Sequence, residues 1–121
     1  MTSPTPQEAR LTRRKYRNVP TVVDGIRFAS KAEAKRYGEL KLLAKAGAIT
    51  GLELQHRYPL HDVSGAIAAH YVADFDYFDT KRGQHITEDV KGVLTRAFKL
   101  KAKFFEAQYG RPITLIQRPS P

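Results

Sequence analysis

Two aspartates and one lysine on neighbouring predicted strands are the side chains best suited to chemistry. Asp89 and Lys91 are two positions apart, so on a strand they project from one face, about 6.6 Å apart along the chain. Asp74 falls on the preceding strand, which should run antiparallel. Paired carboxylates suit Mg²⁺, which takes one or two of them with water and substrate phosphate. With Lys91 beside the developing charge, the pattern indicates metal-dependent phosphodiester hydrolysis. A plain surface ion pair of Asp89 and Lys91 is the simpler alternative.

Glu33 has two interpretations. It ends the sequence Ser30-x-x-Glu33, a capping box that satisfies free amides at a helix start. It also lies on the helix side expected to meet the sheet, where a carboxylate needs a partner. Both roles hold together if the helix begins beside the site.

Three further polar residues near this set have simpler expected roles. Asp76 shares the strand face of Asp74 but lies nearer the strand end, so we expect it to be solvated or to support the ligands from behind. Glu88 points to the opposite face and is not expected to be a ligand. Gln55, on an earlier strand, is expected to reach the edge of the site.

The charges are distributed unevenly along the chain. The 121 residues carry 21 Lys and Arg against 12 Asp and Glu, a formal net charge of +9. Five of the twelve carboxylates fall within residues 74–89. So strong a positive balance suggests a nucleic acid partner. A purely electrostatic binder has no use for carboxylates concentrated near its phosphates, whereas a metal-dependent nuclease needs both.

Two basic segments are expected to contact DNA phosphates. Residues 10–17 read RLTRRKYR, and residues 90–105, which lead into the predicted last helix, contain no acid. The simpler alternatives are a targeting signal for the first segment and a solvated stripe for the second. The expected contacts are Arg13, Arg14, Lys15, Arg96, Lys99 and Lys103.

Several functional classes are excluded by composition. Cysteine is absent, which excludes disulfides, thiolate zinc sites and a cysteine nucleophile, and agrees with a reducing cytoplasm. No apolar run approaches the ~18 residues of a membrane span. The polar beginning MTSPTPQEAR lacks the apolar stretch of a secretory signal. The four histidines have no spacing typical of metal ligands.

The elements that must position this set form a single domain. Residues 1–18 are expected to be a flexible basic arm and residues 19–118 one domain. The capping and turn signals include Asp24-Gly25 for a hairpin, Ser30 and Thr95 as helix caps, and Gly47 and Gly110 as helix ends. The predicted order is a hairpin at 19–28, a helix from about 30, strands at 52–60, 69–79 and 85–91, a helix at 95–109 and a strand at 112–117.

This order predicts an α/β fold of the α+β type, with helices flanking a mixed sheet. The three successive strands should form an antiparallel meander, and the last strand should lie parallel to 85–91 after a right-handed crossover. Alternation along residues 71–78 places Tyr71, Ala73, Phe75 and Tyr77 on one side, facing the core.

Asp74, a gap, and then Asp89-x-Lys91 on the next strand resemble the motif of the PD-(D/E)xK nuclease superfamily. Ala73 stands where the superfamily signature has proline. A closer resemblance is to a family of small phage-type, nuclease-like proteins of unassigned function. It is carried by the segments FASKAEAKRYGEL (28–40), YVADFDYF (71–78) and EDVKG (88–92).

The resemblance implies a restriction-endonuclease-like αβββαβ core and a Mg²⁺-dependent endonuclease acting on DNA, with Mn²⁺ as a substitute. It implies that Asp74, Asp89 and Glu33 hold the metal, assisted by the Val90 carbonyl, and that Lys91 positions or activates the attacking water. Some relatives cut branched DNA as homodimers, which suggests a junction-cleaving role in a bacterial or phage-infected cell. The rival hypotheses are a non-catalytic nucleic-acid-binding or recombination-accessory module and an RNA-associated basic protein.

Overall fold

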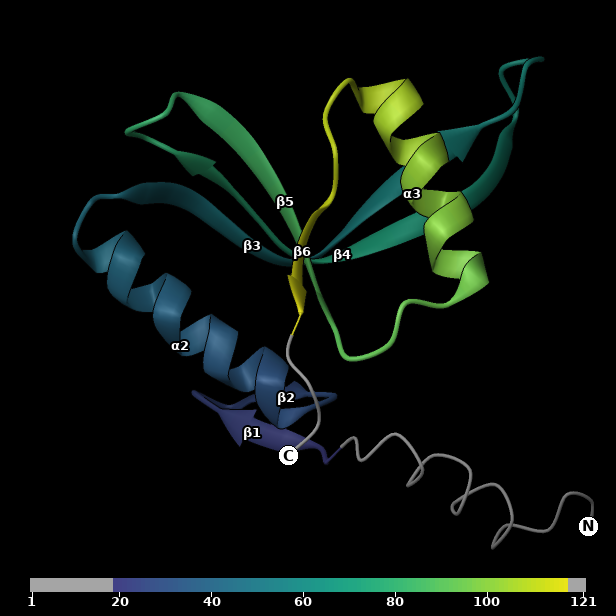
Figure 1. Ribbon diagram of the computed structural model, residues 1–121. Coiled ribbons are helices and arrows are strands. Elements are labelled where there is room, and N and C mark those ends of the chain that lie inside the picture. Colours follow the sequence, from purple (N-terminus) through teal and green to yellow (C-terminus); the bar gives the residue numbers. More distant parts are fainter. Residues whose placement is uncertain (1–18, 118–121) are drawn as a thin grey trace, which may run out of the picture.

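The computed structural model describes residues 19–117, so the predicted arm lies outside the described residues. The fold is α+β, with a two-stranded hairpin, two helices and a four-stranded mixed sheet (Figure 1). The elements are β1 (Thr21–Val23), β2 (Ile26–Phe28), α2 (Lys31–Lys45), β3 (Ile49–His61), β4 (Ile67–Asp79), β5 (Gln84–Lys91), α3 (Arg96–Tyr109) and β6 (Thr114–Gln117). Their order is the one predicted from the sequence. In the described residues, neither helix has the length and apolar character that crossing a membrane requires.

The larger sheet has the strand order β3-β4-β5-β6. β3, β4 and β5 pair antiparallel, and β6 pairs parallel to β5 after α3, which confirms the predicted meander and crossover. β3 is longer than predicted. The sequence pattern breaks at Gly51, whereas the strand passes through an irregularity between Thr50 and Glu53 and begins at Ile49.

Both helices begin and end at the residues that the capping signals indicated. The Ser30 side chain accepts the Glu33 amide proton at 3.2 Å, and the Thr95 hydroxyl accepts that of Phe98 at 3.1 Å. Gly110 follows α3 with a φ of 73°, a left-handed conformation that glycine adopts without steric cost. These caps fix where α2 and α3 start relative to the sheet.

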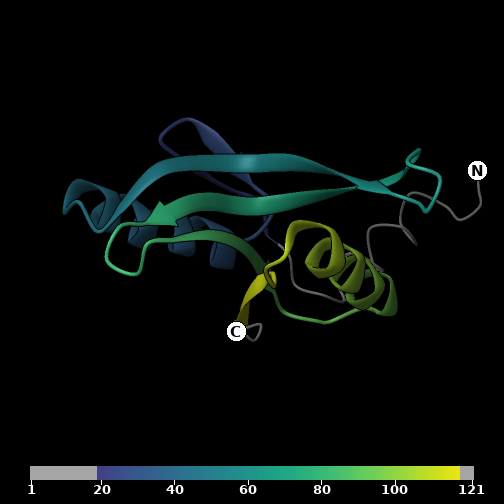
Figure 2. The same cartoon turned by 90° about the horizontal axis from the view of Figure 1, so that it is seen from above.

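The buried side chains form two clusters, one under each helix. Figures 1 and 2 show α2 beside the end of the sheet where β3 begins, and α3 beside the part that leads to the β3–β4 turn. The cluster of α2 includes Phe28, Tyr37, Leu40 and Phe75. The cluster of α3 includes Tyr58, Tyr71, Phe98 and Phe105.

The single core-facing row predicted for β4 is divided between these clusters. Tyr71, Ala73, Phe75 and Tyr77 are all buried, as expected. The first two pack with α3 and the last two with α2. Gln55 on β3 lies opposite the point on β4 between Ala73 and Phe75, where this division falls. It adopts a φ of 54°, so β3 and β4 do not form a regular flat ribbon. Alternation assigns a residue to a strand face, but it does not say which helix covers each part of a long strand.

Candidate functional site

Asp74 and Asp89 meet between β4 and β5, where the backbone ladder stops. The last pair of the ladder joins Phe75 and Glu88. One position further, the Asp74 carboxylate replaces a backbone acceptor, because its Oδ2 atom accepts the Val90 amide proton at 2.8 Å. A bond to a main-chain amide fixes the carboxylate in place, and it holds Asp74 against the strand that carries Asp89.

Asp89 is 3% exposed and has two stabilising partners. The Tyr71 hydroxyl donates to its Oδ2 atom at 2.7 Å, and Lys91 Nζ lies 3.3 Å from its Oδ1 atom. Lys91 is half-buried, and its ammonium group also lies 4.6 Å from the centre of the Phe98 ring. The predicted pairing of Asp89 with Lys91 on one strand face is present in the structure.

The ionised form of Asp74 is disfavoured by its surroundings in the metal-free protein. Burial, followed by the charges of Asp89 and Glu33, raises the pKa of Asp74 to about 7, against an ordinary value of 3.8. A hydrogen bond between the Asp74 and Asp89 carboxyl groups adds to this increase. In the metal-free protein Asp74 therefore holds a proton more readily than an ordinary aspartate does.

Glu33 forms the predicted capping box, and its carboxylate lies within electrostatic range of the aspartates. Its amide is capped by Ser30, whose hydroxyl lies 3.4 Å from Glu33 Oε2, so the capping box is formed. Burial raises the pKa of Glu33, and the charge of Asp89 raises it further, while Ser30 and Lys91 act in the opposite direction. The start of α2 therefore lies within electrostatic range of the aspartates.

The described part of the chain contains no group of three or more His, Cys, Asp or Glu side chains that could hold a metal ion, so the structure does not bring Glu33, Asp74 and Asp89 together as a set of three ligands. Gln55 is placed as predicted at the edge of the site, with its amide nitrogen 3.5 Å from Asp74 Oδ1. Hard oxygen donors are therefore concentrated at the Asp74–Asp89 pair, and a Mg²⁺ site needs no more than one or two protein carboxylates.

A family model described as a protein of unknown function, DUF1064, matches residues 13–118, a range that contains every described element. The chain belongs to the DUF1064 family. No curated protein and no solved structure matches it. Because the family description states no activity, the function of this DUF1064 protein has to be argued from the site itself.

The expectation that Asp76 would be solvated is wrong. Asp76 is 5% exposed, and its carboxylate accepts hydrogen bonds from Tyr58 and, at 3.0 Å, from Thr87. His85 pairs with it, and Arg111 Nη2 donates to Tyr58 at 2.8 Å and to Thr87 at 3.0 Å. These partners come from β3, β5 and the segment after α3, so Asp76 ties these elements together.

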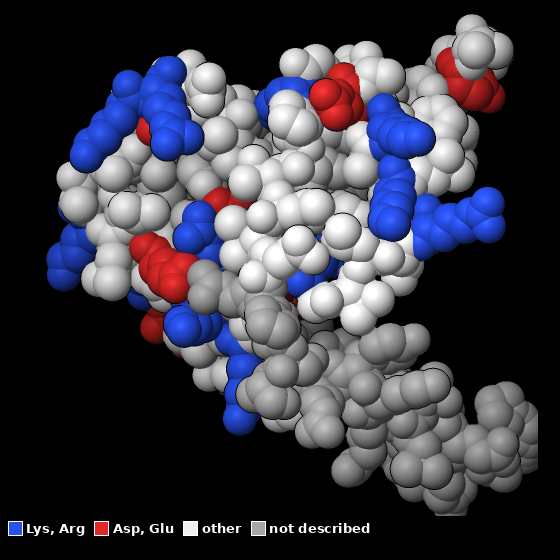
Figure 3. Space-filling model, in the orientation of Figure 1, with Lys and Arg blue, Asp and Glu red and all other residues white. Residues whose placement is uncertain are grey.

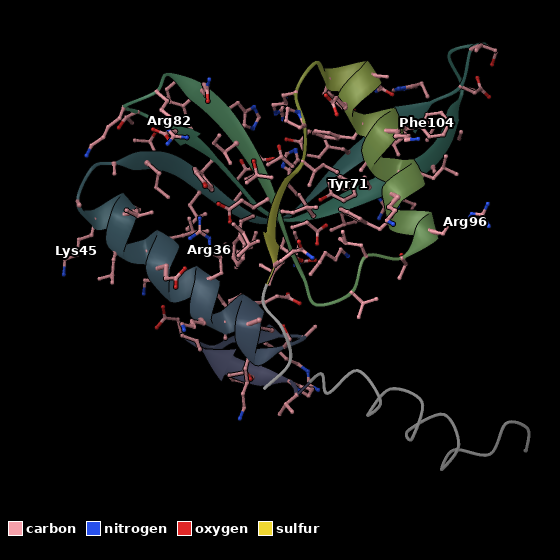
Figure 4. All side chains as sticks on the ribbon, viewed as in Figure 1. Arg36, Lys45, Tyr71, Arg82, Arg96 and Phe104 are labelled. Atoms are coloured by element: carbon pink, nitrogen blue, oxygen red, sulfur yellow. The ribbon has the colours of Figure 1, made fainter. Side chains whose placement is uncertain are left out.

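Glu88 is directed away from the aspartate pair, as predicted. It is 1% exposed, and Arg36 of α2 forms a two-point contact with it, at 2.8 Å from Nε and 2.6 Å from Nη2. Tyr77 donates a further hydrogen bond. Figure 4 shows Arg36 on the side of α2 that faces the sheet. Glu88 is thus fully paired.

The predicted basic stripe is exposed on α3. In Figure 3, Lys and Arg side chains project along the right of the molecule, where α3 lies, and Figure 4 shows Arg96 extending outward. The first turn of α3 contains no acidic residue. The three exposed residues are Arg96, Lys99 and Lys103. The other predicted DNA contacts, Arg13, Arg14 and Lys15, lie outside the described residues.

Sequence reasoning did not identify Tyr71 and Phe98 as neighbours of the site. Their spacing assigns both to the core, and their rings do pack there. The polar end of Tyr71 nevertheless reaches Asp89, and Phe98 lies under Lys91. The signal that could have found this contact is a buried tyrosine, which needs a partner for its hydroxyl group, on a strand next to the one that carries Asp89.

Proposed function

We propose that this DUF1064 protein is a Mg²⁺-dependent endonuclease that hydrolyses DNA phosphodiester bonds. The observation that carries the proposal is the Asp74–Asp89 pair, with Asp89 buried, Asp74 partly buried and Lys91 beside them, in a chain of net charge +9. Acidic groups forced together by the fold need a cation or a proton. A basic protein that holds such a pair suits a substrate that brings phosphate to a metal ion.

The donor set fits a hard divalent cation. Asp74 and Asp89 would hold it, and Glu33 would contribute directly or through water, with the Val90 carbonyl as a further oxygen ligand. Once bound, the cation would polarise a phosphoryl oxygen and acidify a water molecule. Mn²⁺, which takes the same oxygen ligands, would substitute.

The roles of the protein's own groups follow from their contacts. The Val90 amide fixes Asp74, and the Tyr71 hydroxyl orients Asp89. Lys91, held by Asp89 and the Phe98 ring, is near enough to position the attacking water and to stabilise charge that develops on the phosphate. The α3 stripe would bind the backbone of the same DNA.

The resemblance to PD-(D/E)xK nucleases supports the same assignment, since Asp74 and Asp89-x-Lys91 stand on adjacent strands of an αβββαβ arrangement. By that resemblance, branched DNA is a candidate substrate and a homodimer a candidate assembly. A phage or bacterial DNA-processing role in the cytoplasm is the corresponding setting. The alternative of a non-catalytic binding module makes no use of this pair of carboxylates.

The test is a cleavage screen over linear, flapped and four-way DNA and over RNA, with Mg²⁺, Mn²⁺ or EDTA. We expect cleavage of at least one DNA form with either metal and none with EDTA. Asp89→Asn should abolish cleavage, although asparagine retains an oxygen for Tyr71. Asp79→Asn, at a turn where its side chain accepts the Lys81 amide proton at 3.1 Å, is the matched control and should cut normally. Binding without cleavage of any form would favour the accessory-module alternative.

A further inference from the structure

A cleft of about 320 Å³ opens beside Asp89, between β4 and the first turns of α3. Its size is at the lower end of the range for small-molecule sites, about 300–1,000 Å³. Asp89 and Lys91 line one wall, so the cleft begins at the proposed reaction centre and extends away from it. Figure 4 shows Tyr71 between the sheet and α3, where this cleft lies.

Apolar groups form much of the cleft. The rings of Tyr71 and Phe98 are buried at its base, and Ala97 and Val72 also line it. Val72 is 40% exposed although it lies on a strand. An apolar lining of this kind, next to a charged centre, offers contact area for a flat or aliphatic group such as a nucleobase or a sugar ring.

Two ammonium groups complement this lining. Lys91 lies at the Asp89 wall, and Lys101 lines the cleft from α3, held by a 3.0 Å hydrogen bond from its Nζ atom to the His70 carbonyl. A ligand that brings an apolar ring together with a phosphate would match both features. Phosphate alone would leave the apolar surface uncovered, and an apolar molecule alone would make no use of the two lysines.

From these contacts, and resting on the proposed function, we infer that the cleft binds one unpaired nucleotide next to the phosphate that is cut. A base within a duplex is stacked and paired, so it reaches such a cleft only after it has left the helix. DNA with a single-stranded portion meets no such cost. The preferred substrate is therefore DNA with unpaired nucleotides, such as a flap, a branch point or a free single strand, over a continuous duplex.

The first experiment measures binding without cleavage. Fluorescence anisotropy in EDTA compares a labelled oligothymidylate with a duplex of the same length, and we expect the wild type to bind the single strand more tightly. Lys101→Ala should weaken single-strand binding about fivefold or more, with a smaller effect on the duplex. Lys103→Ala, on the exposed stripe of the same helix, should weaken both probes alike.

The second pair of variants tests whether the open volume of the cleft is needed for binding. Ala97→Leu fills the cleft without a change in charge and should weaken single-strand binding about tenfold. Ala107→Leu makes the same change at an exposed position of α3 that does not line the cleft, and it should bind as the wild type does. Thermal melting of all four variants verifies that each is folded.

The outcomes separate this inference from the proposed function. Equal effects of Lys101→Ala and Lys103→Ala on the two probes, or an Ala97→Leu variant that binds normally, would overturn the nucleotide cleft even if the protein cuts DNA. The expected binding pattern in a protein that never cuts with Mg²⁺ or Mn²⁺ would instead overturn the nuclease and leave the nucleotide site standing.

Discussion

Glu88 and Asp89 are neighbours in sequence, and both are almost completely buried. The groups that surround the two carboxylates are nevertheless very different. Glu88 faces α2, where Arg36 contacts both of its oxygens and Tyr77 donates a hydrogen bond. Asp89 lies beside a second carboxylate, that of Asp74. The Tyr71 hydroxyl and the Lys91 ammonium partly offset the negative charge there.

The comparison separates a buried charge that is fully paired from one that we propose to bind a cation. A buried ion pair with good geometry is electrostatically complete, and it has nothing left to offer a ligand. Asp74, by contrast, is partly buried beside a second acid that raises its pKa, and under our proposal a bound cation would relieve this repulsion. Burial alone therefore does not identify the site, whereas the balance of charge around each buried group does.

The largest effect that would sharpen this comparison is on catalysis. For the proposed nuclease, Lys91→Ala should lower the cleavage rate by about 10²–10³-fold, because it would remove the cation that we place nearest the reacting phosphate. DNA affinity should change little, since many other groups still bind the phosphate backbone. Single-turnover cleavage and anisotropy measure the two quantities. Lys45→Ala, at the exposed end of α2, is the control, and cleavage by Lys91→Ala at the wild-type rate would refute the assignment.

The next effect is on stability, at Glu88. Glu88→Gln keeps the shape of the side chain but removes the buried charge that pairs with Arg36, which then keeps only Glu39 as an acidic partner, so the free energy of unfolding should fall by about 1.5–3 kcal/mol. Glu53→Gln removes an exposed charge and should change it by less than about 0.5 kcal/mol. Urea denaturation measures both. A Glu88→Gln variant as stable as the wild type would show that the ion pair of Glu88 with Arg36 does not stabilise the fold.

At the aspartate pair, the same kind of change should stabilise the metal-free protein. Asp74→Asn removes one of two repelling acids, so in EDTA at pH 8 we expect unfolding to require about 1–3 kcal/mol more. Mg²⁺ or Mn²⁺ should raise the melting temperature of the wild type but not of this variant. Melting curves of both proteins with and without metal measure these effects. A less stable variant, together with a wild type whose melting temperature does not change with metal, would contradict the metal site.

The pH dependence of stability gives a related and smaller signal. The pKa of Asp74 is about 7 in the folded protein against 3.8 ordinarily, so the folded state holds the extra proton between these values. Metal-free stability should therefore fall as the pH rises from about 4 to about 7. The difference between wild type and Asp74→Asn, followed by urea denaturation across this range, isolates the effect. A difference that does not vary with pH would show that Asp74 titrates normally.

The smallest effect concerns the exposed charges. Replacing Arg96, Lys99 and Lys103 by alanine should reduce the slope of log affinity against log salt, by up to about 0.9 for each duplex phosphate that the side chains no longer neutralise. A matched triple replacement of Lys45, Lys81 and Arg82, all exposed and on other elements, should leave the slope unchanged. Equal slopes for the two triple variants would mean that the α3 stripe is only a solvated surface.

Much of the fold could be predicted because its signals are local. Ser30 and Thr95 cap their helices through residues three positions away, and the spacing of Asp89 and Lys91 fixes their common face. The hairpin at Asp24-Gly25 is equally local, with both residues at positive φ.

The interactions that sequence reasoning did not supply are long-range. Arg36 and Glu88 are 52 positions apart, and Asp76 is buried by residues on other strands and after α3. No local sequence pattern predicts such partners, so the strand pattern alone does not show that Asp76 is buried. The division of the β4 row depends on where each helix covers a long ribbon, which is also a property of the whole fold.

The Val90 amide gives this site a reporter that needs no substrate. Its proton is shared with Asp74 Oδ2 at 2.8 Å, where an ordinary strand would offer a carbonyl oxygen. The chemical shift of that proton and its rate of exchange with deuterium therefore depend on the charge and position of one carboxylate. A single backbone resonance, followed while diamagnetic Mg²⁺ is added, would read the occupancy of the aspartate pair directly, independently of whether any nucleic acid is ever cut.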